Sequence, residues 1–168
     1  MGPDDPMMTN WSDVQHAAPD LAELVRSRFE ATGLGYLATI PRDGSPRISG
    51  NEPLFSGGEI WLGMMWESRK AMDLRRDARL ALHSANEDKE VAGGDARVSG
   101  RAREHTTPEE IDAARRMFAE ETGQAPPPGP MHLFSIDVSE VVFVRPEDDR
   151  LVIRTWSPAS GERRHERT

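Results

Sequence analysis

Apolar and polar residues alternate along several short stretches of the chain, which is the pattern of half-buried β-strands. Turn-forming residues separate these stretches, and the Asp-Gly pair at residues 43–44 is typical of a β-hairpin turn. Short strands joined by hairpins predict an antiparallel barrel or sandwich rather than a doubly wound parallel sheet. The expected strands cover residues 35–40, 46–54, 59–65, 78–84, 97–102, 131–138, 141–145 and 151–156.

Helical patterns are expected in three further stretches, residues 19–32, 68–77 and 107–123. The third has the clearest start signal: Thr107 can cap the helix, a proline follows at the first helical position, and Glu110 stands three residues after the cap. The proline-rich residues 125–130 cannot continue this helix, so we expect them to form a stiff extended loop.

The two ends of the chain show little periodicity. Residues 1–16 are expected to form a loose arm that Trp11 pins to the domain. Residues 157–168 carry several charges and are expected to form a solvated tail. The length between them suits one hydrophobic core, so residues 17–168 are expected to fold as a single domain.

Composition removes several classes of function. The chain has no cysteine, which excludes disulfides, thiol catalysis and thiolate metal sites and suits a reducing cytoplasm. Its five histidines lack metal-ligand spacing, so no metal site is expected. The formal net charge of -8 argues against general nucleic-acid binding. No apolar run approaches the roughly 20 residues of a membrane span, and we expect a cytoplasmic protein without a membrane partner.

A concentrated anion site is predicted where the second expected helix begins. Ser68, Arg69 and Lys70 put a hydroxyl and two adjacent cations beside the positive end of the helix dipole, so a phosphate would fit there. The alternative from these residues alone is a solvated helix that Ser68 merely caps. The position of the three residues between two β-type stretches favours the phosphate site.

Six segments within residues 35–102 follow one another in a recognisable order, namely Leu37-Ala38-Thr39-Ile40, Asp43-Gly44-Ser45-Pro46-Arg47, Ile60-Trp61-Leu62, Ser68-Arg69-Lys70-Ala71, Asp77-Ala78-Arg79-Leu80-Ala81-Leu82 and Val98-Ser99-Gly100-Arg101-Ala102. In these segments the chain resembles the pyridoxamine 5'-phosphate oxidase-like family of flavin-binding split barrels. The resemblance implies a mainly β protein with a few helices, built on a six-stranded antiparallel split β-barrel that forms a homodimer and holds FMN between its subunits.

The resemblance also implies which residues bind the cofactor. The flavin phosphate falls on Arg69 and Lys70, beside Ser68. The isoalloxazine ring falls on the second and third expected strands, at Arg47, Ile48, Ser49, Gly50, Asn51, Gly63 and Met64. A glycine within a strand permits close approach of a ligand, but it also suits a bulge or a barrel corner, and both interpretations of Gly50 and Gly63 stay open.

Two departures from the family pattern bear on the activity. Asp95 stands near the place of a glutamine that reaches the flavin in the oxidase, and the tail at Arg163-Arg164-His165 is only loosely similar to the oxidase's substrate motif. Both argue against pyridoxamine phosphate as the substrate. A deazaflavin cofactor, which many relatives use, remains the alternative to FMN.

The leading expectation is therefore a homodimeric flavin or deazaflavin oxidoreductase acting on an unidentified small molecule, in which the cofactor performs the chemistry. No side chain is nominated as a catalytic acid or base. Two rival interpretations stay open: a split barrel that stores or senses a cofactor without turnover, and a structural dimer with an empty groove. Met64, Met65 and Trp66 could cover a bound ring, but interface packing is the preferred role for them.

Overall fold

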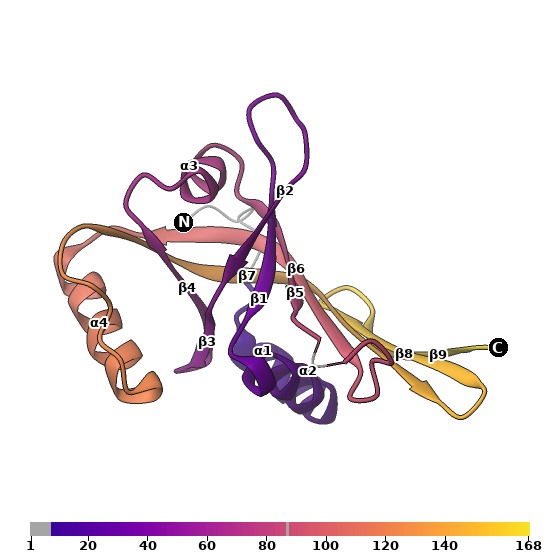
Figure 1. The fold of residues 1–168 in the computed structure, drawn as a ribbon. Helices are drawn as coiled ribbons and strands as arrows, with labels where there is room; N and C mark the ends of the chain where they lie inside the picture. Colours follow the sequence, from indigo (N-terminus) through magenta and orange to yellow (C-terminus); the bar gives the residue numbers. More distant parts are fainter. Residues whose placement is uncertain (1–7, 87) are drawn as a thin grey trace.

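The computed structural model describes residues 8–86 and 88–168, which contain four helices and nine strands (Figure 1). The helices are α1 (Trp11–Ala17), α2 (Pro19–Thr32), α3 (Arg69–Arg76) and α4 (Pro108–Thr122). The strands are β1 (Gly35–Thr39), β2 (Arg47–Asn51), β3 (Pro53–Ser56), β4 (Glu59–Met65), β5 (Arg79–Ser84), β6 (Asp95–His105), β7 (Met131–Glu147), β8 (Arg150–Ser157) and β9 (Gly161–Arg167).

All strand pairs are antiparallel, and the strand order is β2-β1-β5-β6-β7-β4-β3. The long strand β7 joins the parts of the sheet, because its first residues pair with β4 and its last residues pair with β8. The β8–β9 hairpin extends from this end, away from the helices (Figure 1). The prediction of a mainly β, antiparallel fold is confirmed.

The expected strands differ from the observed ones in three places. The stretch 46–54 is two strands, β2 and β3, since pairing changes partner before Pro53, which has no backbone N–H to donate. The stretches 131–138 and 141–145 are one strand, because the register with β6 shifts at Ser99 and Gly100 and leaves Ser139 unpaired without ending the strand. The tail expected at residues 157–168 is wrong as to secondary structure, because β9 pairs with β8 over seven positions, but its side chains are exposed to solvent as expected.

The loose arm expected for residues 1–16 is wrong where the structure describes it, since α1 begins at Trp11. Asn10 caps this helix in a capping box with Asp13, which satisfies backbone donors that an arm would expose. Trp11 is 2% exposed and meets the ring of Phe55 edge-on, with the ring centroids 5.0 Å apart. The prediction that Trp11 fixes this segment is therefore confirmed, while residues 1–7 lie outside the described part.

The core lies between α1 and α2 and the inner face of the sheet. Among the described residues, no helix is long and apolar enough to cross a bilayer. The predicted start of α4 is confirmed, because Thr107 and Glu110 form a capping box there. Residues 125–130 contain no helix, and the guanidinium of Arg115 holds this proline-rich loop to α4 by donating to the carbonyls of Pro127 and Gly129.

Candidate functional site

A groove of 1130 Å³ opens beside the end of β4, where the predicted phosphate site begins. The helices α2 and α4, the strands β2, β3 and β4 and the proline-rich loop all contribute to its walls. Pockets for small ligands usually have about 300–1,000 Å³, so this groove has room for a cofactor with several rings.

Five of the ten predicted cofactor residues line this groove, and they come from three different elements. Those that line it are Gly50, Asn51, Gly63, Met64 and Lys70. The other five lie outside the lining, namely Arg47, Ile48, Ser49, Ser68 and Arg69. The structure thus brings the ends of β2 and β4 together with the first turn of α3, as the assignment requires, but leaves cofactor binding itself a prediction.

Lys70 joins two of these elements. Its ammonium Nζ donates to the carbonyl oxygen of Gly50 at 2.5 Å, which ties the first turn of α3 to β2. Burial of the ammonium lowers the pKa of Lys70 from its ordinary value. An ammonium has three donors, so a second acceptor can bind to Lys70 while the contact to Gly50 persists.

Arg69 stands beside Lys70 at the start of α3 and is exposed. In the described part of the chain, its guanidinium has neither a hydrogen bond nor an ion pair. Ser68 occupies the cap position, but its hydroxyl makes no capping bond, and its buried oxygen has no partner among these residues. The first turn of α3 therefore keeps free backbone donors beside an unpaired cation, which is the chemistry of an anion site.

Arg47 has a structural partner instead of a free guanidinium. Its Nε donates to the Oδ2 atom of Asp73 at 2.7 Å, and the Thr39 hydroxyl donates to the same oxygen at 3.0 Å. Burial would raise the pKa of Asp73, but the hydrogen bonds from Arg47 and Thr39 outweigh it and hold that pKa below its usual range. This ion pair fixes β2 against α3, and β2 also carries the Gly50 carbonyl that accepts the hydrogen bond from Lys70.

The remaining strand residues divide between the groove and the outer surface. A Cβ atom added to Gly50 would meet nothing within 4 Å, whereas one added to Gly63 would lie 3.3 Å from the methyl carbon of Met131. Close packing therefore accounts for Gly63, while open space at Gly50 leaves room for a ligand. Asn51 Nδ2 donates to the Gly63 carbonyl at 3.4 Å on the buried face of β2. Ile48, which is 71% exposed, lies on the opposite face, the same face as Gly50.

Sequence reasoning missed part of the groove wall. Trp66, Phe118 and Met131 line it together with the prolines of residues 126–130. Phe118 and the loop lie more than 45 residues after Lys70 in the chain, so no local spacing could have placed them. Interface packing is the role that the sequence favours for Trp66, and it does not place Trp66 in the groove, because ring binding and packing use the same residue type.

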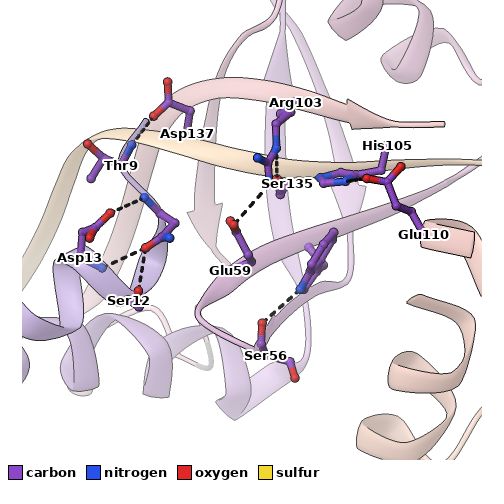
Figure 2. A network of polar contacts seen from close by, with 12 residues as sticks. Thr9, Ser12, Asp13, Ser56, Glu59, Arg103, His105, Glu110, Ser135 and Asp137 are labelled. Atoms are coloured by element: carbon purple, nitrogen blue, oxygen red, sulfur yellow. Dashed lines mark hydrogen bonds and ion pairs between the residues drawn. The ribbon is translucent and has the colours of Figure 1, made fainter. Parts of the chain in front are cut away.

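A second polar network lies at the start of α4 (Figure 2). His105 contacts the hydroxyl of Ser135 through Nε2 at 2.9 Å and Glu110 through Nδ1 at 3.0 Å. The hydrogen bonds from His105 and Thr107 lower the pKa of Glu110 to about 2. This connectivity is that of a hydrolase triad, but Ser135 is 1% exposed and its oxygen also accepts from Arg103 at 3.2 Å. The serine is thus closed to a substrate, and the network anchors α4 to β6 and β7.

A charged pair lies next to this network. Burial raises the pKa of Glu59, and Arg103 opposes that shift from 3.3 Å. Within the described ranges, no three His, Asp or Glu side chains are placed to hold a metal ion.

The chain matches one family model and is similar in fold to several solved structures. Residues 21–145 match the family model described as pyridoxamine 5'-phosphate oxidase. No curated protein matches the chain. The fold is similar to that of PhzG from Burkholderia lata 383, solved with tetrahydrophenazine-1-carboxylic acid, at a TM-score of 0.66 and 16% identity over 100% of this chain and 97% of that chain.

Two further solved structures have the same fold. A conserved hypothetical protein from Mycobacterium tuberculosis is 24% identical, with a TM-score of 0.55, over 64% of this chain and 74% of that one. An F420 reductase is 13% identical, with a TM-score of 0.51, over 64% of this chain and 87% of that one. The matched family model spans most of the chain, and the chain therefore belongs to the pyridoxamine 5'-phosphate oxidase family.

Proposed function

We propose that this protein is a homodimeric oxidoreductase that binds FMN, with the phosphate on Arg69 and Lys70 and the ring in the groove. The observation that carries the proposal is the start of α3, where a guanidinium and backbone donors without partners among the described residues lie beside a lysine of the groove wall. Family membership supports redox chemistry, since the similar structures include an F420 reductase.

The protein's part in this chemistry is binding and orientation. A flavin supplies hydride or electron transfer when it is bound. Arg69 and Lys70 would hold its phosphate by charge-assisted hydrogen bonds, and the Arg47–Asp73 pair would keep β2 at a fixed distance from them. Gly50 leaves the space in which a flat ring can approach the strand.

Exposed apolar side chains support the dimer. Tyr36 is 53% exposed and Ile48 is 71% exposed. Both lie on one face of the β1–β2 pair, because Tyr36 stands opposite Gly50 and Ile48 stands opposite Ala38 in the strand register. A second copy of the chain would cover this face and close the site from the outside.

The first test is titration with FMN and with the deazaflavin F420, followed by fluorescence of the cofactor. We expect micromolar binding of one of them, and replacing both cations (Arg69→Ala with Lys70→Ala) should weaken it by about a hundredfold, because two charge-assisted contacts are lost. Arg79→Ala is the matched control, since Arg79 is also exposed but pairs with Asp77 outside the groove. Failure of the wild type to bind either cofactor would refute the proposal.

Two alternatives are separated by the same preparation. Binding of F420 in place of FMN would assign a deazaflavin cofactor, the alternative that the similarity to an F420 reductase supports. Reduction of the bound cofactor by a donor and its reoxidation by an acceptor would establish an enzyme. A bound cofactor that never turns over would indicate a storage or sensing module.

A further inference from the structure

Trp66 lies at the corner where β4 turns into α3. The turn is closed by the amide of Ser68, which donates to the carbonyl of Met65 at 3.1 Å, and Glu67 inside it has a φ of 54°. A positive φ at this position of a turn is restrictive for a residue with a side chain, so the corner is well defined. Trp66 is 51% exposed and lines the groove, three residues before Arg69.

The indole of Trp66 is stacked on a buried histidine. The ring centroids of Trp66 and His132 are 4.5 Å apart, and the planes differ by 4°. His132 is 2% exposed and stands opposite Met64 in the register of β4 and β7. One face of the indole therefore has a rigid neighbour, while half of the side chain's surface remains open.

A chain of polar contacts fixes the plane of the histidine ring. His132 Nδ1 lies 2.9 Å from Glu104 Oε1, and Glu104 Oε2 accepts from Arg75 Nε at 3.0 Å. Arg75 belongs to α3, Glu104 to β6 and His132 to β7, so three elements combine to orient one ring. The contacts leave the imidazole little freedom to rotate, and its orientation passes to the indole stacked on it.

The stacked histidine leaves a buried nitrogen without a hydrogen bond among the described residues, and this loss of stability suggests that the arrangement serves a function. Nε2 of His132 is buried and has no hydrogen-bond partner in the described part of the chain. A phenylalanine could stack on Trp66 without stranding a polar nitrogen, but it could not be oriented by Glu104. An imidazole is the side chain that combines the two contacts.

We propose that Trp66, held in its plane by His132, is a stacking platform for the conjugated ring of a ligand in the groove. His132 is a positioning residue that acts through Trp66. The inference rests on the proposed function for the phosphate end of the ligand, and it adds the group that binds the ring. A conjugated ring can belong to the cofactor or to an aromatic substrate, and both offer the same flat π surface.

Riboflavin tests the platform separately from the phosphate site, because it has the flavin ring without the phosphate. We expect Trp66→Leu to weaken riboflavin binding roughly tenfold, as loss of a ring-stacking contact commonly does. Trp66→Phe keeps an aromatic face and should bind within about threefold of the wild type. Leu151→Ala, at an exposed apolar residue outside the groove, is the control and should bind as the wild type does.

A double-mutant cycle tests the positioning role. His132→Gln should weaken binding nearly as much as Trp66→Leu, and the double variant should be no weaker than Trp66→Leu alone. A merely structural histidine would lower affinity equally in both backgrounds, and that result would refute its role. Glu104→Gln provides a milder change at a half-buried site, with circular dichroism melts to verify that every variant is folded.

The source of the ring is settled by a second titration, of menadione into FMN-loaded protein. Weaker binding of riboflavin and FMN to Trp66→Leu assigns the platform to the cofactor ring, and weaker binding of menadione alone assigns it to a substrate ring. Equal binding of all three to Trp66→Leu and wild type, or no binding of any, overturns the proposal. If riboflavin binding depends on Trp66 but FMN gains nothing from Arg69 and Lys70, the phosphate assignment fails while the platform stands.

Discussion

Asp73 links α3 to β2 at the candidate site through its ion pair with Arg47, and replacing it tests how much that link contributes to stability. Asp73 is 4% exposed, and its carboxylate accepts from Arg47 and Thr39 and lies 3.5 Å from Arg76. Asp73→Asn keeps the shape of the side chain but removes the negative charge that Arg47, Thr39 and Arg76 contact. A hydrogen bond to a charged group contributes about 1.5–3 kcal/mol, so we expect the free energy of unfolding to fall by about 2 kcal/mol at pH 7.

The pH dependence makes this expectation specific. Because the folded pKa of Asp73 is lowered, its ionised form contributes stability above the ordinary aspartate pKa of about 3.9, and that contribution disappears as the pH falls through the lower folded value. The difference between wild type and Asp73→Asn should therefore be constant from pH 7 to about pH 5 and should shrink progressively below pH 4.

Urea denaturation followed by circular dichroism measures both quantities, with Asp77→Asn as the matched control. Asp77 also pairs with an arginine, but its partner Arg79 is largely exposed, so the substitution should barely change the unfolding midpoint. A loss of stability on Asp73→Asn that is the same at pH 3 and pH 7 would show that the ionised carboxylate of Asp73 is not the source of the contribution, and would refute the ion-pair reasoning.

Two other predictions concern backbone positions. A Cβ atom on Gly100 would lie 2.1 Å from the backbone oxygen of Asp137, so Gly100→Ala should lower the free energy of unfolding by about 3 kcal/mol in a urea titration. Gly50→Ala is the control and should leave that free energy within about 0.5 kcal/mol of the wild type. Equal effects of the two substitutions would contradict the close approach at the β6–β7 bulge. Thr107→Ala removes the cap of α4 and should cost about 1 kcal/mol, with faster amide hydrogen exchange confined to residues 108–122; unchanged exchange there would show that the His105 network alone holds the helix.

The fold was predictable where each element carries its own signal. The strands around residues 35–40 and 59–65 and the start of α4 at Thr107 follow from alternation and capping residues that lie within a few positions of each other. β9 was missed because it has no alternating apolar residues: its pairing with β8 is accompanied by ion pairs such as Arg154–Glu162 and Arg150–Glu166. A strand of charged residues and a solvated tail look alike until the partner strand is known.

The bulge in β7 shows a related limit. Ser139 and Glu140 interrupt the apolar pattern, so the sequence predicted a break between two strands. β7 continues because its extra residue, Ser139, forms a bulge opposite Ser99 and Gly100, and pairing with β6 resumes on both sides of it. Whether an interrupted pattern marks a break or a bulge depends on the partner strand, which the sequence of β7 alone does not specify.

Some residues of the candidate site could be assigned from local sequence features, and others depend on contacts that the fold makes. Arg69 and Lys70 could be assigned because a helix start and two adjacent cations are local features, and the structure leaves Arg69 unpaired in the described part of the chain. Arg47 looked equivalent in the sequence, but its charge is taken by Asp73, 26 residues later. The same holds for Trp66, whose orientation depends on His132 and hence on Glu104. The sequence therefore shows where charged and aromatic side chains occur, whereas their partners and orientations are set by residues that lie close only in the folded chain.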